Sequence, residues 1–549
     1  MKKPEGRVKF RDSLSALMKL AAPDTAGVLL RCLLGSVRIV ASLLFVWISK
    51  TLVDTATGQH DGPLARYVAV MVGIMLLQCV TGLLASYVEG RMNVRTIVRL
   101  RAMTFSRILR SEWNGREQMH TGDAVNRMES DVTVLADLIC SRMPDIIITV
   151  CQLIAASFYL LEMSPGLMWL LISLMVLAAA GSKLYFVRIR ELTSAIRKKE
   201  SQIQGYMQEN LLHRAVALTL AGIDGVLEKL ASHQNDVVEN TERRLRYGIA
   251  GRGLLSLGFA AGYASAFFWG IFGIRSGAVT FGTMTAFLQL VGQVQSPIAG
   301  LSRHIPAFIH ALTSVDRISE IMGLKEEHYG TPVHVAHLPG IEVRNVSFVY
   351  PDNSKKVLDG FSCVFRPGSF TAITGETGAG KSTLMRLLLA LLHPTEGEIV
   401  ITDGDSEITV STDTRCNFMY VPQGNTLMSG TIRDNFLMAN PDATEEEMTT
   451  ALKDAAADFI LEKPDGLDTV CSEQGGGLSE GQAQRVAIAR ALLHTGSILI
   501  MDESTSALDP ATELHVLDRL RARCKGSKTV IFVSHRETVS DWADSVIRL

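Results

Sequence analysis

Closely spaced cysteines are missing from this sequence of 549 residues. The eight cysteines are spread over the whole chain, and no CxxC pair or zinc-ligand spacing occurs. We therefore expect reduced, buried thiols, not a disulfide framework or a structural zinc site. The N-terminus also lacks the small-residue cleavage site of a signal peptide. Residues 1–24 are instead predicted to form a basic amphipathic segment that lies on a membrane face.

A strong net charge is also missing, because the formal charge at pH 7 is only −2. Residues 1–330 carry roughly 35 basic and 26 acidic side chains, whereas residues 331–549 carry roughly 19 and 30. Neither half is basic enough to indicate a nucleic-acid-binding protein. A mean hydropathy of +0.21 argues against a wholly soluble protein, and 20% charged residues argue against a wholly membrane-buried one. Length and composition therefore predict two chemically different folding units.

The first half contains six stretches that are long and apolar enough to cross a bilayer. They lie at about 25–52, 64–88, 139–161, 166–187, 253–275 and 281–302. The loops after the second and fourth stretches are rich in Arg and Lys, whereas the other three connections hold one basic residue, Arg275. The positive-inside rule therefore places the N-terminus, both long loops and the C-terminal half in the cytoplasm. Both long loops keep helical periodicity, so we expect the spans to continue as helices beyond the bilayer.

The second half begins after a linker at about 323–340, where short β-branched runs alternate with helical stretches and predict an α/β domain. The string GETGAGKST, Gly375–Thr383, follows the apolar run FTAIT and precedes the helical run LMRLLLALL. This order of strand, Gly-rich loop and helix is the context of a P-loop. Its glycines let backbone N–H groups surround a phosphate, while Lys381 faces the β and γ oxygens. The hydroxyl of Ser382 can ligate Mg²⁺.

A pair of carboxylates follows about 120 residues later, at the end of the apolar run SILIM. A buried parallel strand would deliver Asp502 and Glu503 at the carboxyl edge of its sheet. Asp502 would hold Mg²⁺ through water, and Glu503 would polarise the water that attacks the phosphate. An apolar strand that ends in Asp-Glu is a weak signal alone. After a P-loop it indicates a nucleotide hydrolase.

These motifs and the sequence between them resemble the ATP-binding cassette (ABC) transporters. GETGAGKST looks like the family's P-loop, LSEGQ at 478–482 its signature, ILIMDE its Walker B strand and SALD its D-loop. By the same resemblance, Gln423 is the Q-loop glutamine, His535 the switch histidine and Tyr350 the aromatic that stacks on adenine. The resemblance covers the membrane half too, since HTGDAVNRMESDV, the six spans and the run ending VDRISEIM look like the six-helix exporter fold.

The resemblance implies an α-helical membrane domain of six long helices fused to an α/β P-loop ATPase cassette. The expected domains are 1–322 with an N-terminal elbow helix, a linker at 323–340, and a nucleotide-binding domain at 341–549. The implied activity is ATP-driven transport with ATP and Mg²⁺ as cofactors. The implied nucleotide-binding residues are Tyr350, Gly375, Glu376, Thr377, Gly378, Ala379, Gly380, Lys381, Ser382, Thr383, Ser479, Gly481 and Gln482. The implied catalytic residues are Glu503, His535 and Gln423, and the implied Mg²⁺ ligands are Ser382, Gln423 and Asp502.

One chain carries one membrane domain and one cassette, so the resemblance also implies a dimer. Each nucleotide would lie between the P-loop of one copy and Ser479 and Gly481 of the other. We favour a homodimer, and a heterodimer with a sister half-transporter is the alternative. Coupling helices near 114–122 and 209–217 would dock onto the cassettes. The other partners are a lipid bilayer, expected to be the bacterial inner membrane, and an unidentified substrate, with no nucleic acid.

The signature departs from the family's usual LSGGQ, because its third position is Glu480. We expect this carboxylate to lie on the outside of the helix N-terminus, where the helix dipole favours acids. In the membrane half, Arg31 is expected at the headgroup level. The deeper Arg38, together with Gln289 and Gln293, could line a substrate path or bridge helices.

The sequence leaves the direction of transport and the substrate open. Export is favoured, and the alternative is import or lipid flipping by the same fold. An ATP-gated channel or sensor is less favoured, and unidirectional, ATP-consuming flux against a gradient would distinguish a transporter from it.

Overall fold

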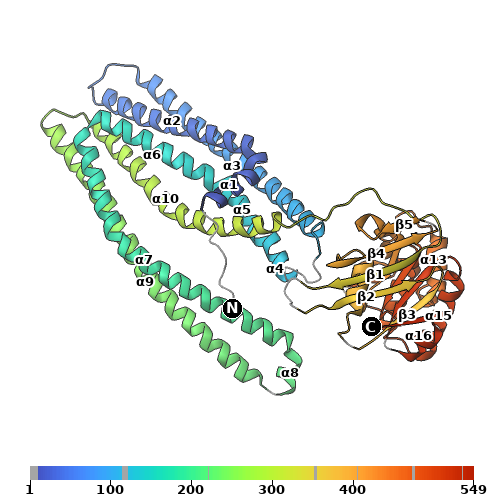
Figure 1. The fold of residues 1–549 in the computed structure, drawn as a ribbon. Helices are drawn as coiled ribbons and strands as arrows, with labels where there is room; N and C mark the ends of the chain where they lie inside the picture. The colour runs from blue at the N-terminus through green and yellow to red at the C-terminus, as the bar shows by residue number, and fades with distance from the viewer. Residues whose placement is uncertain are drawn as a thin grey trace. The chain divides into compact units, whose positions relative to one another are not determined.

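The computed structural model describes residues 10–113, 121–220, 222–350, 355–376, 378–404, 406–472, 476–534 and 536–549 (Figure 1). The chain forms two compact units. The first, helical unit comprises residues 1–104 and 126–320, and the second comprises 105–125 and 321–549. The end of the second long helix therefore belongs to the unit that contains the α/β domain.

The helical unit is built from long helices joined by short connections. Its elements are α1 (Phe10–Ala21), α2 (Thr25–Ala56), α3 (Leu64–Leu109), α4 (Thr121–Asn126), α5 (Val132–Asp137), α6 (Met143–Met163), α7 (Pro165–Leu212), α8 (Arg214–Thr219), α9 (Ile223–Arg275) and α10 (Phe281–Met322). Single π turns, Arg127–Asp131 and Leu138–Arg142, stand before and after α5. Figure 1 shows α7 and α9 running side by side along most of their length.

The predicted membrane spans lie within these helices. Within the described residues, four helical segments are long and apolar enough to cross a membrane: Asp12–Ala56, Leu64–Leu109, Gly122–Met163 and Ile223–Arg275. The predicted spans at 166–187 and 281–302 lie in α7 and α10, which have 48 and 42 residues. Because about 20 residues cross a bilayer, α3, α7, α9 and α10 extend well beyond it, as expected. The span predicted from residue 139 begins in a π turn, not in regular α-helix.

The second unit contains two sheets. A parallel sheet has the order β11-β3-β10-β9-β6, and an antiparallel sheet has the order β2-β1-β4-β5. The strands are β1 (Gly340–Phe348), β2 (Leu358–Phe365), β3 (Phe370–Thr374), β4 (Glu396–Asp403), β5 (Ser406–Thr409), β6 (Phe418–Val421), β9 (Ile498–Asp502), β10 (Thr529–Val533) and β11 (Ser545–Arg548), with a small pair, β7 (Gly430–Thr431) and β8 (Val470–Cys471). The helices are α11 (Lys381–Leu388), α12 (Ile432–Leu437), α13 (Glu445–Asp454), α14 (Glu480–Leu492), α15 (Pro510–Cys524) and α16 (Glu537–Trp542).

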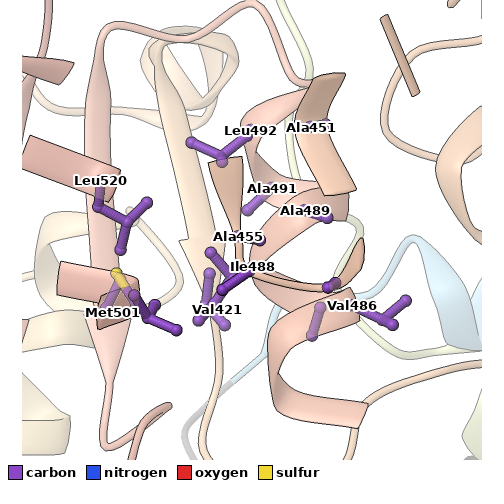
Figure 2. Close-up of a cluster of buried hydrophobic side chains, with 14 of the residues drawn as sticks. Val421, Ala451, Ala455, Val486, Ile488, Ala489, Ala491, Leu492, Met501 and Leu520 are labelled. Carbon is purple, nitrogen blue, oxygen red and sulfur yellow. The ribbon is translucent and has the colours of Figure 1, made fainter. Parts of the chain in front are cut away.

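Alternating side chains of the parallel sheet form two hydrophobic cores. In β9, Leu499 and Met501 belong to the core with α13, α14 and α15, whereas Ile498 and Ile500 belong to the core with α11. Figure 2 shows the first core, where Ile488 of α14 lies near Val421 of β6. The central strands β3, β9 and β10 are buried on both faces, which explains their continuous apolar runs, whereas the edge strand β11 is largely exposed. This packing brings the carboxyl ends of β3, β9, β10 and β6 to one edge of the sheet.

Candidate nucleotide site

The loop between β3 and α11 has the backbone conformation of a phosphate cradle. Gly378 and Gly380 have φ of 90° and 100°, values that side chains disfavour. A Cβ on Gly380 would also lie 3.2 Å from the carbonyl oxygen of Val357. The ammonium group of Lys381 donates to the carbonyls of Gly375 at 2.8 Å and Glu376 at 2.9 Å. These bonds hold the loop curved at the N-terminus of α11, where N–H groups attract an anion.

The two predicted carboxylates lie at the end of β9. Asp502 is buried, and burial together with the neighbouring Glu503 raises the pKa of its carboxyl group, although Arg386 and Lys381 act to lower it. Glu503 leaves the strand with a φ of 47°, an uncommon conformation for a residue with a side chain. Its backbone N–H donates to the carbonyl of Val533 on β10. The backbone therefore turns sharply at Glu503, directly after the buried Asp502.

The site has the donor set that Mg²⁺ prefers when it is bound together with a nucleotide. Ser382 supplies an exposed hydroxyl, Gln423 an amide oxygen and Asp502 a carboxylate. Mg²⁺ is normally held by one or two carboxylates plus phosphate oxygens. Among the described residues, no cluster of three His, Cys, Asp or Glu side chains could hold a metal by itself. The residues therefore fit Mg²⁺ that arrives with ATP, and the ion would neutralise charge on the phosphates and on Asp502.

Tyr350 lies beside the P-loop helix. Its hydroxyl is 3.0 Å from the hydroxyl of Thr383, and the Arg386 guanidinium donates to it at 3.3 Å. The ring also makes an edge contact with Phe348, with centroids 4.9 Å apart. Arg386 in turn lies over the ring of Trp113, 4.9 Å from its centroid. Trp113 and Arg386 belong to no recognised motif, so sequence reasoning did not identify them.

The signature residues form the start of α14. The Ser479 hydroxyl accepts from the Gln482 N–H, and the Ser479 N–H donates to the Gln482 side chain, which completes a capping box. A Cβ on Gly481 would lie only 3.1 Å from the carbonyl oxygen of Ala507, which accounts for glycine there. Glu480 lies in the first turn with an exposed side chain. The outward direction of its carboxylate in a dimer stays a prediction, because Ser479 beside it is exposed as well.

Two predicted site residues, Thr377 and His535, lie outside the described residues. The remaining nucleotide-binding and catalytic candidates belong to the second unit. The P-loop, Gln423 and Asp502–Glu503 come together because they follow the carboxyl ends of β3, β6 and β9.

The candidates for a substrate path belong to the helical unit. Gln289 donates to the hydroxyl of Ser49 at 3.1 Å, and Gln293 donates to that of Ser42 at 2.8 Å. Both glutamines therefore bridge α10 to α2, which was one of the two interpretations of these residues. Arg38 is exposed in the isolated chain.

Arg31 is buried in a polar cluster, a surrounding that the sequence did not predict, and its expected headgroup level stays a prediction. Its guanidinium lies 2.8 Å from Glu89 on α3 and 2.8 Å from Asp145 on α6. It also donates to the carbonyl of Cys140 in the second π turn. No local sequence signal identified these partners, since each lies on a different helix.

Comparisons with known proteins agree with this geometry. The model of the "ABC transporter transmembrane region" matches residues 28–298, and the "ABC transporter" model, which describes the cassette, matches residues 358–506. This chain is an ABC transporter. Its cassette hydrolyses ATP to drive the transport of a substrate, and the predicted fold is confirmed.

Individual relatives of this ABC transporter cover almost its whole length. It is 28% identical to an ATP-dependent lipid A-core flippase of Methylococcus capsulatus, over 91% of this chain and 84% of the relative. It is 29% identical to the cyclolysin secretion/processing ATP-binding protein CyaB of Bordetella pertussis, over 98% of this chain and 76% of the relative. The solved structure of a bacterial Atm1-family ABC exporter with ATP bound matches with a TM-score of 0.79 and 25% identity, over 96% of this chain and 93% of that one. The names of these relatives refer to different substrates, so they assign none to this chain.

Proposed function

We propose that two copies of this chain form a homodimeric exporter with two equivalent ATP sites. Each site would combine Lys381 and Glu503 of one copy with Ser479 and Gly481 of the other. The observation that carries this proposal is the complete set of site elements in one chain: a curved P-loop, two carboxylates after β9 and a capped signature helix. Neither site of a homodimer would therefore lack a hydrolytic group.

The residues in each site would have separate roles. Lys381, Ser382 and Asp502 would hold ATP and Mg²⁺, and Tyr350 would contact adenine. Glu503 would orient and activate the attacking water, with Gln423 and His535 completing the site around the γ-phosphate. The hydrogen bond from Gln423 to Glu503 supports this assignment, because a general base must be oriented toward the water that it activates.

Transport would follow from ATP-dependent closure of the two cassettes. ATP that binds the closed pair more tightly than the open pair shifts the equilibrium toward closure. Hydrolysis would then allow the pair to reopen, and the long helices would convert each closure into a change of access. The basic loops after the second and fourth spans support a cytoplasmic position for the cassette. The membrane itself would be a bacterial inner membrane.

Mixing two inactive variants tests the composite sites directly. Lys381→Ala disables one P-loop, and Ser479→Arg disables one signature, so each variant alone is expected to lose ATPase activity. In a mixed dimer, one site pairs two damaged elements and the other pairs two intact ones. Co-expression should therefore restore about a quarter of the wild-type rate if copies pair at random. No recovery, with mixed dimers present by mass measurement, would rule out sites shared between copies.

Transport itself requires a separate assay. Reconstituted protein would be screened for compounds that stimulate ATPase activity, and each positive compound would be tested for ATP-dependent flux against a gradient. Flux away from the cassette side supports export. Flux toward the cassette, or movement of a lipid between leaflets, would favour the importer or flippase alternative.

A further inference from the structure

A buried carboxylate contacts the loop that follows Glu503 and has no role in the functions described above. Glu513, in the first turn of α15, is completely buried. One of its oxygens accepts from the hydroxyl of Thr505 at 2.7 Å. The other accepts from Arg536 at 3.0 Å and from Thr538 at 3.0 Å. A buried carboxylate is tolerated only when it is paired and hydrogen-bonded, and Glu513 meets both conditions.

Arg536 connects this carboxylate to the loop Ser504–Asp509, which follows Glu503 directly. Its guanidinium donates to the carbonyl of Leu508 at 2.9 Å and to that of Ser506 at 2.7 Å. Two backbone carbonyls of the loop are therefore held by one planar side chain. A lysine amine could not reproduce this fork of donors, because it is a single point charge. Arg536 is also the residue after His535 in the sequence.

The same loop is held a second time by the signature helix. Gln484 of α14 is buried, accepts from the N–H of Ala507 at 3.2 Å and donates to the Ser506 hydroxyl at 3.4 Å. The loop therefore has polar attachments to α14 through Gln484, and to α15 and the segment after β10 through Glu513 and Arg536. Its conformation is determined by side chains from three separate segments.

We infer that Arg536 and Glu513 are positioning residues for ATP hydrolysis, which hold the Ser504–Asp509 loop so that Glu503 keeps its orientation. The inference rests on the role proposed for Glu503. Neither residue touches the P-loop in the described contacts, so neither should contribute to ATP affinity. A small displacement of a catalytic group can lower a rate by about a hundredfold. Loosening the loop should therefore slow hydrolysis and leave nucleotide binding intact.

The test compares Arg536→Lys and Glu513→Gln with wild type in the full-length reconstituted protein. Each variant should lower kcat for ATP between about tenfold and a hundredfold, with KM and ATP affinity within about threefold. The double variant should cost less than the product of the two single losses, because both act through one network. Arg519→Lys is the matched control. Arg519 lies on α15, as Glu513 does, but among the described residues it pairs with Asp458 and has no contact with the loop. This variant should leave kcat unchanged.

A purely structural ion pair would give a different result. Its removal would lower the thermal unfolding midpoint, or it would lower ATP affinity and kcat together. A normal kcat in Arg536→Lys would overturn the inference. If Glu513→Gln fails to fold, Arg536→Lys decides alone, because the Arg536 side chain is 36% exposed and its replacement keeps the charge. Glu503→Gln is assayed in parallel. Normal ATP hydrolysis in Glu503→Gln would refute the role of Glu503 itself. Loss of hydrolysis in Glu503→Gln together with a normal kcat in Arg536→Lys would refute only the positioning role.

Discussion

The side-chain amide of Gln423 donates a hydrogen bond of 2.7 Å to the carboxylate of Glu503. The two residues are 80 positions apart in the sequence. They meet because Gln423 follows β6 and Glu503 follows β9, which are neighbouring parallel strands. The carboxyl ends of parallel strands lie at the same edge of a sheet, so the contact is a direct consequence of the topology. This hydrogen bond orients the carboxylate of the proposed general base.

Replacing Glu503 with Gln should separate ATP binding from ATP hydrolysis. Gln keeps the size of the side chain and its hydrogen-bonding capacity, but it cannot accept a proton. General-base catalysis contributes about 10²–10⁴-fold, so hydrolysis should slow by at least about a hundredfold. ATP affinity should stay near the wild-type value, and the protein should accumulate as an ATP-bound closed dimer. Nucleotide affinity, steady-state ATPase activity and a distance probe between cassettes would be measured on one preparation.

Lys381→Ala is the contrasting variant for this experiment, because it should weaken ATP binding and hydrolysis together. If Glu503→Gln hydrolyses ATP within a few fold of wild type, Glu503 is not the base. Loss of ATP binding without a closed dimer would equally contradict the assigned role.

Replacing Glu480 with Gly should change ATPase turnover by less than about tenfold, or ~1.4 kcal/mol of barrier. The side chain is exposed in the first turn of α14 and makes no contribution to the capping box of Ser479 and Gln482. Steady-state ATPase activity of the purified variant checks this prediction. A larger change in either direction would indicate that Glu480 contacts the nucleotide or the partner cassette.

Replacing Arg31 with Met should destabilise the helical unit by about 2–4 kcal/mol. The change leaves Glu89 and Asp145 without the cation that they share, and the carbonyl of Cys140 without this donor. Arg38→Met is the matched control, because it removes an exposed arginine from the same helix and should cost less than about 1 kcal/mol. Thermal unfolding in detergent micelles measures both variants. Equal midpoints would show that the cluster contributes little to stability.

Replacing Glu327 with Gln should destabilise the cassette unit in a pH-dependent way. Burial acts to raise the pKa of Glu327, but hydrogen bonds from Arg415 and Tyr329 outweigh it and hold the pKa below its ordinary value of 4.5. A lowered folded pKa means that the ionised group stabilises the fold above pH 4.5. This stability is lost as the pH falls from there through the folded-state pKa.

Denaturant unfolding of the full chain in detergent should therefore show a loss of about 1–3 kcal/mol in Glu327→Gln at pH 7. The difference from wild type should shrink as the pH falls below about 4.5. Glu446→Gln, which changes an exposed carboxylate, serves as the control and should cost less than about 0.5 kcal/mol. A pH-independent difference would contradict the ionic origin of the effect.

Most of the nucleotide site could be predicted from the sequence, because its motifs are short and locally encoded. The P-loop needs glycines at positions with positive φ and a lysine at the helix start, and these requirements fall within nine consecutive residues. The membrane spans were predictable for a similar reason, since a bilayer demands a continuous apolar run. The expected roles of Tyr350, Gln423 and His535 depended on the family resemblance, not on local physics.

The sequence by itself therefore determined the two-part architecture and the residues of the hydrolysis motifs. Only the tertiary structure decided which polar side chains meet. Arg31 could be recognised from the sequence as an arginine near a membrane span, but its partners Glu89 and Asp145 lie on two other helices. Glu513 and Arg536 carry no motif, yet together they hold the loop after Glu503. Hydrophobic periodicity and short motifs encode local structure, whereas a buried ion pair is specified only when packed helices and strands bring distant residues within a few ångströms.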